Sequence, residues 1–141
     1  NCRFGDPETQ VVLPLLETDI MDIIEAVWEE KLDTLDIKWS DKSCACVVMA
    51  SGGYPEKYET GKVISGLDEN GQCEGAFVYH AGTKLEDGKF LTAGGRVLGI
   101  TAYGDTLKEA LDTAYKAVDT ISFEKAHYRH DIGKKALSAL K

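Results

Sequence analysis

The chain has 141 residues, of which 43% are hydrophobic and 28% charged, a balance that is typical of a folded globular protein and excludes a disordered one. Its length fits one domain, or a small domain with a fragment of another. The net charge is −8 and the basic residues form no cluster, so nothing supports a nucleic-acid partner. No stretch is apolar enough to predict a membrane span or a signal peptide.

The four cysteines lack the paired spacing of a zinc site. They are Cys2, Cys44, Cys46 and Cys73. Cys44 and Cys46 share one face if they lie on a strand, which suits small buried side chains. We therefore expect reduced thiols in a cytoplasmic protein.

The first predicted element is a short helix that begins near Asp6 and Pro7, with Asp6 as the N-cap and Pro7 at the first helical position. Its apolar face contains Val11, Val12, Leu15 and Leu16. Pro14 should shorten or bend it.

A second helix follows, capped by Asp19 and with Asp22 in its first turn. One face carries Ile20, Ile23, Ile24, Val27 and Trp28. We expect Trp39 to be a packing residue near a domain boundary.

After residue 43 the pattern changes to strands. Asp87-Gly88 predicts a type I′ hairpin turn, since both central positions of that turn need positive φ. The expected strands are Cys44–Met49, Lys62–Ser65, Gly75–His80 and Arg96–Tyr103.

The last long element is a helix that begins with a capping box formed by Thr106 and Glu109. Its predicted buried face contains Leu107, Ala110, Leu111, Ala114, Val118 and Ile121. The fold class is therefore α+β: a small antiparallel sheet or barrel with one long covering helix, preceded by a helical segment. We place the boundary between residues 1–40 and 41–141.

All three arginines lie beside Gly or Asp in compact motifs: Arg3, Arg96 and Arg129. The arginine fork fits two oxygens of a carboxylate or phosphate. For Arg129, a structural ion pair with Asp131 is the favoured interpretation. Asn1 and Arg3 would share a face on an extended segment, and an amide oxygen suits Mg²⁺, although this spacing is common by chance.

Five motifs occur along the chain in one order: NCRFGDPETQ, SGGYP, HAGT, TAGGRVLG and YRHDIG. Together they make the chain similar to the C-terminal part of glycinamide ribonucleotide synthetases, the phosphoribosylamine–glycine ligases of purine biosynthesis. The resemblance implies an ATP-dependent ligase that activates glycine as an acyl phosphate, which the amine of 5-phosphoribosylamine then attacks. It also implies Mg²⁺ or Mn²⁺, with ATP as co-substrate.

The resemblance implies specific roles for residues of the first motif. Asn1 would bind Mg²⁺, and Arg3 would lie against the transferred phosphoryl group and the glycine carboxylate. Asp6 would orient the amine of phosphoribosylamine, or else act only as the helix N-cap.

In the later motifs, Gly94, Gly95 and Arg96 would bind the 5-phosphate of the substrate, with Lys89 as a second phosphate contact or merely a solvated hairpin residue. Ser51-Gly52-Gly53 would shape the same pocket or form a tight turn with positive φ. Arg3 and the Gly94–Arg96 turn should therefore face one cleft.

The resemblance also implies that residues 1–40 end an ATP-grasp domain and that residues 41–141 form a barrel-sandwich-hybrid-like C-terminal domain. The upstream domains of the same chain would be its partners, because the ATP-grasp lysines and a metal-binding Glu expected two residues before Asn1 are absent. Glu56 stands where relatives often have Gly. We expect the chain to be part of a longer protein and inactive alone.

Two alternatives remain open. One is the C-terminal domain of another ATP-grasp enzyme, and the other is a non-catalytic domain that binds a sugar phosphate or a partner protein. His80, His127 and His130 do not form a metal triad by spacing. We expect His80 to be a packed strand residue and the other two to lie at the surface or between domains.

Overall fold

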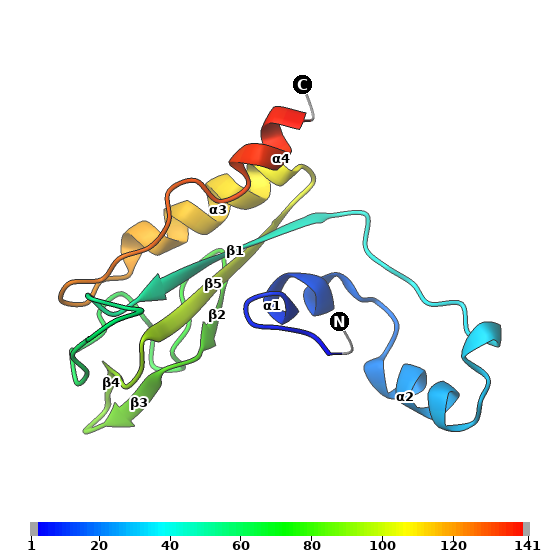
Figure 1. Ribbon diagram of the computed structural model, residues 1–141, viewed down its shortest axis with the longest axis horizontal. Helices are drawn as coiled ribbons and strands as arrows, with labels where there is room; N and C mark the ends of the chain where they lie inside the picture. Colours follow the sequence, from blue (N-terminus) through cyan, green and yellow to red (C-terminus); the bar gives the residue numbers. More distant parts are fainter. Residues whose placement is uncertain (1–2, 140–141) are drawn as a thin grey trace.

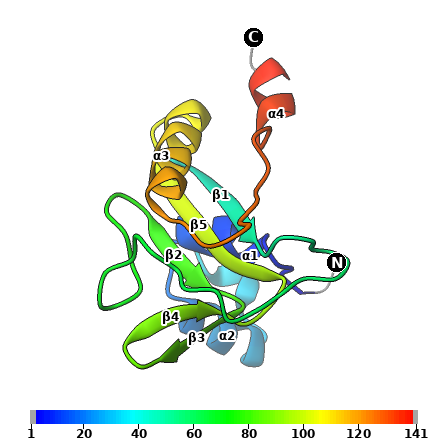
Figure 2. The same cartoon turned by 90° about the vertical axis from the view of Figure 1, so that its left-hand side faces the viewer.

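The structure, a computed structural model, describes residues 3–139 and contains two small antiparallel sheets, the larger of which has helices on both faces (Figures 1 and 2). The strands are β1 (Ser43–Ala50), β2 (Phe77–His80), β3 (Thr83–Glu86), β4 (Lys89–Thr92) and β5 (Arg96–Gly104). The helices are α1 (Thr9–Val12), α2 (Ile20–Trp28), α3 (Leu107–Thr120) and α4 (Lys134–Ala139), with 3₁₀ turns at Leu13–Leu15 and Leu32–Thr34. The α+β prediction is confirmed at this level.

Strand β5 is the centre of the larger sheet, whose order is β1-β5-β2. Ile100 lies opposite Val47 on one side and Val78 on the other. All three side chains are buried, because α3 packs across this face of the sheet (Figure 1). Because β5 is buried along nearly its whole length, most of its residues are apolar and do not alternate with polar ones.

The start of α3 confirms the predicted capping residues, with one difference. Thr106 Oγ1 accepts a hydrogen bond from Glu109 N at 3.2 Å, whereas Glu109 Oε2 accepts from Asp105 N at 3.0 Å instead of from the cap residue itself. The buried face contains Ala110, Leu111, Ala114, Ala117 and Val118. Ile121 is also buried, but it is the C-cap and not a helical residue.

Leu98 in β5 offers a direct test of this core, because its side chain is 0% exposed. Replacing Leu98 with alanine should lower the free energy of unfolding by about 2–5 kcal/mol, since a cavity remains where the side chain was. Leu85→Ala is the matched control, because Leu85 is 63% exposed and its truncation should cost less than about 1 kcal/mol. Urea unfolding of both variants measures the difference, and equal losses would contradict this core assignment.

The hairpin prediction is confirmed, and one strand prediction is wrong. Asp87 and Gly88 have φ values of 48° and 71° between β3 and β4, as a type I′ turn requires. Lys62–Ser65 forms no strand of its own. It contributes two isolated bridges, Val63 to Leu91 and Ser65 to Ser122, because its residues pair with different neighbours.

The N-terminal segment lies across the face of the sheet opposite α3 (Figures 1 and 2). Helix α1 is a single turn that passes into a 3₁₀ turn containing Pro14, so the predicted shortening is confirmed. Thr101 Oγ1 donates to Gln10 O at 3.1 Å, and Tyr103 Oη donates to Pro14 O at 3.1 Å. These bonds from β5 fix the segment on the sheet.

Helix α2 forms as predicted, but its apolar face has no cover within residues 3–139. Asp19 caps it by accepting from Met21 N at 2.8 Å. Val27 is 56% and Trp28 88% exposed, and α2 lies apart from the sheet (Figure 1). Trp39, expected to be a packing residue, is 49% exposed.

None of the helices in the described part of the chain has both the length and the apolar character needed to cross a membrane.

Candidate active site

Three glycine-containing motifs meet where β5 begins. Ser51 Oγ donates to Gly94 O at 2.8 Å, and Ser51 N donates to Gly95 O at 2.8 Å. Ala93 N donates to Gly82 O at 2.7 Å, which joins the HAGT turn to the same place. Of the two roles expected for Ser51-Gly52-Gly53, the tight turn with positive φ is confirmed, since Gly53 has a φ of 97°.

Gly95 is required by close packing. A Cβ at this position would lie 2.3 Å from Tyr54 Cδ2, so any larger residue would displace the tyrosine ring. A Cβ on Gly94 would lie 3.1 Å from Gly82 Cα. Both glycines therefore allow the turns to approach one another, which is a structural reason for their presence in addition to the predicted phosphate contact.

The N-terminal motif reaches this turn through Asp6 and Arg96. Arg96 Nη2 lies 3.0 Å from Asp6 Oδ2, and Arg96 Nη1 donates to Asp6 O at 3.1 Å. The N-cap role predicted for Asp6 is wrong, because α1 begins at Thr9 and Glu8 occupies its N-cap position. Asp6 instead uses its carboxylate for Arg96 and for Gln10, whose Nε2 donates to Asp6 Oδ1 at 3.0 Å.

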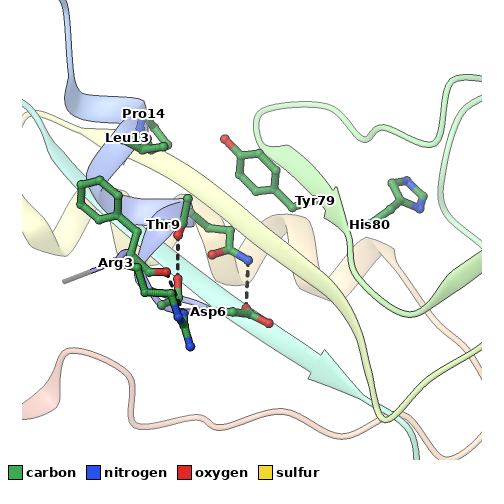
Figure 3. A pocket seen from close by; sticks show the side chains of 10 residues that line it. Arg3, Asp6, Thr9, Leu13, Pro14, Tyr79 and His80 are labelled. Atoms are coloured by element: carbon green, nitrogen blue, oxygen red, sulfur yellow. Dashed lines mark hydrogen bonds between the residues drawn. The ribbon is translucent and has the colours of Figure 1, made fainter. Parts of the chain in front are cut away.

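An open groove of about 570 Å³ lies beside this carboxylate, between the N-terminal segment and β2 (Figure 3). Its lining consists of Arg3, Phe4, Gly5, Asp6, Thr9, Gln10, Leu13, Pro14, Tyr79 and His80. Arg3 and Asp6 lie on one side of it, and Tyr79 faces them from β2 (Figure 3). A cation and an anion at one end of a partly apolar groove can bind a charged small molecule in a fixed orientation.

The predicted site residues are only partly brought together. Arg3 lines the groove with Asp6, and its Nη1 donates to Phe4 O at 2.9 Å. Lys89 begins β4 at the exposed hairpin turn, whereas the Gly94–Arg96 turn follows the other end of that strand. Asn1 lies outside the described residues. Among residues 3–139, no group of three or more histidine, cysteine or acidic side chains could hold a metal ion.

The histidines are not arranged for catalysis. His80 Nε2 donates to Gly71 O at 2.8 Å, and its Nδ1 lies 2.8 Å from Thr83 Oγ1, so both ring nitrogens are used. His127 and His130 are exposed, as expected. Arg129 forms a two-bond ion pair with Asp131, with both distances 2.8 Å, which confirms the structural interpretation of that arginine.

The described cysteines, Cys44, Cys46 and Cys73, are free thiols. Burial raises the pKa of Cys44 to about 11, and the nearby Cys46 adds to the shift. Burial also raises the pKa of Cys46, a hydrogen bond with Thr101 opposes this, and the charge of Asp6 adds to it. These thiols therefore stay protonated near neutral pH and are not activated nucleophiles.

Gln10 lines the groove although the sequence did not single it out as a site residue. The available signal was its position four residues after Asp6, which places the two side chains together if a helical turn forms between them. The contact between Ser51 and Gly94 has no local signal, because 43 residues separate the two.

The fold and the site define a small α+β domain in which glycine-rich turns and an arginine–aspartate pair meet at one end of an antiparallel sheet. A family model described as Phosphoribosylglycinamide synthetase, C domain, matches residues 44–135. The chain belongs to this family.

Relatives extend this similarity along the chain. The chain is 55% identical over 132 residues to a phosphoribosylamine–glycine ligase of Caldanaerobacter subterraneus. This alignment covers 94% of the chain and 31% of that relative. The chain is 50% identical to a bifunctional purine biosynthetic protein of Dictyostelium discoideum, covering 99% of this chain and 17% of the relative. The chain thus spans about a third or less of these proteins.

Among solved structures, the chain is similar to the crystal structure of a phosphoribosylamine–glycine ligase from Thermotoga maritima. The TM-score is 0.72 and the sequence identity 34%, over 93% of this chain and 32% of that one.

Proposed function

We propose that the chain is the C-terminal part of an ATP-dependent ligase that joins 5-phosphoribosylamine to glycine in de novo purine biosynthesis. The observation that carries the proposal is the meeting of four family motifs at one place: Ser51 and Gly82 contact the Gly94–Arg96 turn, and Arg96 binds Asp6. Relatives that carry this ligase name align along most of the chain.

The proposed chemistry has two steps. The glycine carboxylate takes the γ-phosphoryl group of ATP to give glycyl phosphate and ADP. The amine of phosphoribosylamine then attacks the acyl carbon, an amide bond forms, and phosphate leaves. Proteins assist such steps mainly by positioning the reactants and stabilising charge.

Each site residue has a role in this proposal. Arg3 contacts the transferred phosphoryl group and the glycine carboxylate, and Asp6 accepts a hydrogen bond from the substrate amine. Gly94, Gly95 and Arg96 bind the 5-phosphate. Arg96 donates one hydrogen bond to Asp6 O and forms an ion pair with Asp6 Oδ2, and its guanidinium has further N–H donors for phosphate oxygens.

The proposal also assigns roles to Lys89 and to a metal ion. Lys89 is the second phosphate contact of the proposal, although it lies at the far end of β4 from Arg96. Mg²⁺ or Mn²⁺ would neutralise the charge of the ATP phosphates, with Asn1 as this chain's ligand. The residues described by the structure do not fit a complete metal site, so we derive no step through the ion.

The domain assignment is part of the same proposal. Residues 1–40 end an ATP-grasp domain, and the uncovered apolar face of α2 supports this because such a face normally packs against another element. Residues 41–141 form the barrel-sandwich-hybrid-like C-terminal domain. Free thiols at the described cysteines support a cytoplasmic location.

The proposal is tested by measuring ADP formation by the complete protein that carries this sequence. We expect ADP to form only when glycine and phosphoribosylamine are both present, with one glycinamide ribonucleotide made for each ADP. Replacing glycine with formate is the control that separates this ligase from a formate-using ATP-grasp enzyme. ADP formation without glycine, or the absence of ADP from a folded protein, would contradict the proposal.

A further inference from the structure

Gln10 is fixed between Asp6 and the central strand. Its backbone carbonyl accepts a hydrogen bond from Thr101 Oγ1 at 3.1 Å, and Thr101 is 0% exposed on β5. Its side-chain Nε2 donates to Asp6 Oδ1 at 3.0 Å. The sheet therefore holds the glutamine, and the glutamine holds one oxygen of the carboxylate.

Asp6 has two partners of different kinds. Arg96 binds Oδ2, but Arg96 is also the residue proposed to bind the substrate phosphate, so its geometry depends on the ligand. Gln10 binds Oδ1 and has no proposed contact with any substrate. It is thus the partner that can fix the carboxylate before and during the reaction.

The other end of the Gln10 amide argues against a role in packing alone. Gln10 Oε1 is buried and has no hydrogen-bond partner among residues 3–139. A buried acceptor without a partner destabilises a fold. Turning the amide over would not help, because it would place the amide oxygen against the Asp6 carboxylate. A methionine would fill similar space without this cost.

We propose that Gln10 is a positioning residue, which orients the Asp6 carboxylate toward the amine of the amino-sugar phosphate. This inference rests on the proposed function, because it assigns Gln10 a task in the second step of that reaction. The amine must approach the acyl carbon along a defined direction, and a carboxylate free to rotate would hold it less well.

The test is Gln10→Met in the complete ligase. We expect kcat to fall roughly 10- to 100-fold, because a misdirected Asp6 misplaces the nucleophile. The KM values for ATP and glycine should change less than about twofold, because the proposal gives Gln10 no contact with either substrate. The melting temperature should stay equal or rise, since the buried oxygen without a partner is removed. A structural role predicts the reverse: a lower melting temperature with kcat unchanged.

Gln72 is the matched control. Its Nε2 donates to Val78 O at 3.0 Å and its Oε1 accepts from Val78 N at 2.9 Å, so both ends of this amide are satisfied. Gln72→Met should lower the melting temperature and leave kcat within about twofold, because it breaks two structural bonds away from Asp6.

A second variant and a double mutant keep the inference falsifiable. Gln10→Asn retains an amide that is too short to reach Asp6, so it should lose kcat as Gln10→Met does, even if the methionine variant folds poorly. In an Asp6→Asn background, Gln10→Met should reduce kcat less than about twofold further, because both residues act through one carboxylate. Additive losses would overturn the inference.

The outcomes separate the inference from the proposed function. If the wild-type protein is an active ligase and kcat is unchanged in both Gln10 variants, the inference is overturned and the proposed function stands. A folded wild-type protein without glycine-dependent ADP formation would overturn the proposed function and the inference together.

Discussion

Replacing Arg96 with alanine is expected to raise the KM for phosphoribosylamine by roughly 10- to 100-fold in the complete ligase, and the KM for ATP by less than about threefold. Hydrogen bonds to charged groups contribute about 1.5–3 kcal/mol, and about 1.4 kcal/mol corresponds to a factor of ten. Loss of the Asp6 contact should also lower kcat, because the carboxylate loses the partner of its Oδ2. Initial rates at varied concentrations of each substrate measure these effects.

Arg129→Ala is the matched control for Arg96→Ala. Arg129 is an arginine beside an aspartate in a compact motif, but its guanidinium is occupied by Asp131 in an exposed ion pair. Such surface pairs contribute little, so its removal should leave both KM values unchanged. Equal effects of Arg96→Ala on the two KM values would exclude Arg96 from the phosphate site.

The isolated chain of 141 residues is expected to fold and to show no glycine-dependent ATP hydrolysis. Strands β1, β2 and β5 with α3 form a continuous buried core, which supports cooperative unfolding. Holding reactants together provides effective concentrations of about 10⁵–10⁸ M, and most of the proposed site lies outside this chain. We therefore expect the rate to fall below detection, at least about 10⁵-fold under that of the complete ligase at equal concentration.

Circular dichroism and thermal unfolding of the same sample are the controls for this experiment, since an inactive unfolded chain would show nothing about the site. A cooperative transition without ADP formation agrees with the proposal. Glycine-dependent ADP formation by the folded chain alone would show that residues 1–141 contain a complete site.

Several elements could be predicted from the sequence because their signals are local. Asp19 caps α2, Thr106 caps α3, and Asp87-Gly88 forms the hairpin turn, each through contacts between residues close in the chain. The burial of β5 follows from its apolar run. The family motifs also lie in the sequence, so the family could be recognised before the structure was known.

Local signals failed where a distant partner competes for the same side chain. Asp6 has the residue type and position of an N-cap, but Arg96, 90 residues later, takes its carboxylate and α1 begins after Glu8. The segment Lys62–Ser65 has the composition of a strand, yet its residues pair with separate neighbours. In both cases the outcome depends on which segments pack together.

The sequence by itself therefore determined the fold class, the helix caps, the hairpin and the family, because neighbouring residues carry that information through backbone preferences and periodic burial. Only the tertiary structure decided that Arg96 at the glycine-rich turn meets Asp6, that Gln10 donates a hydrogen bond to this carboxylate, and that Tyr54 leaves room only for glycine at position 95. These contacts join residues far apart in the chain. They depend on the packing of the N-terminal segment and the turns around β5, which no local pattern encodes.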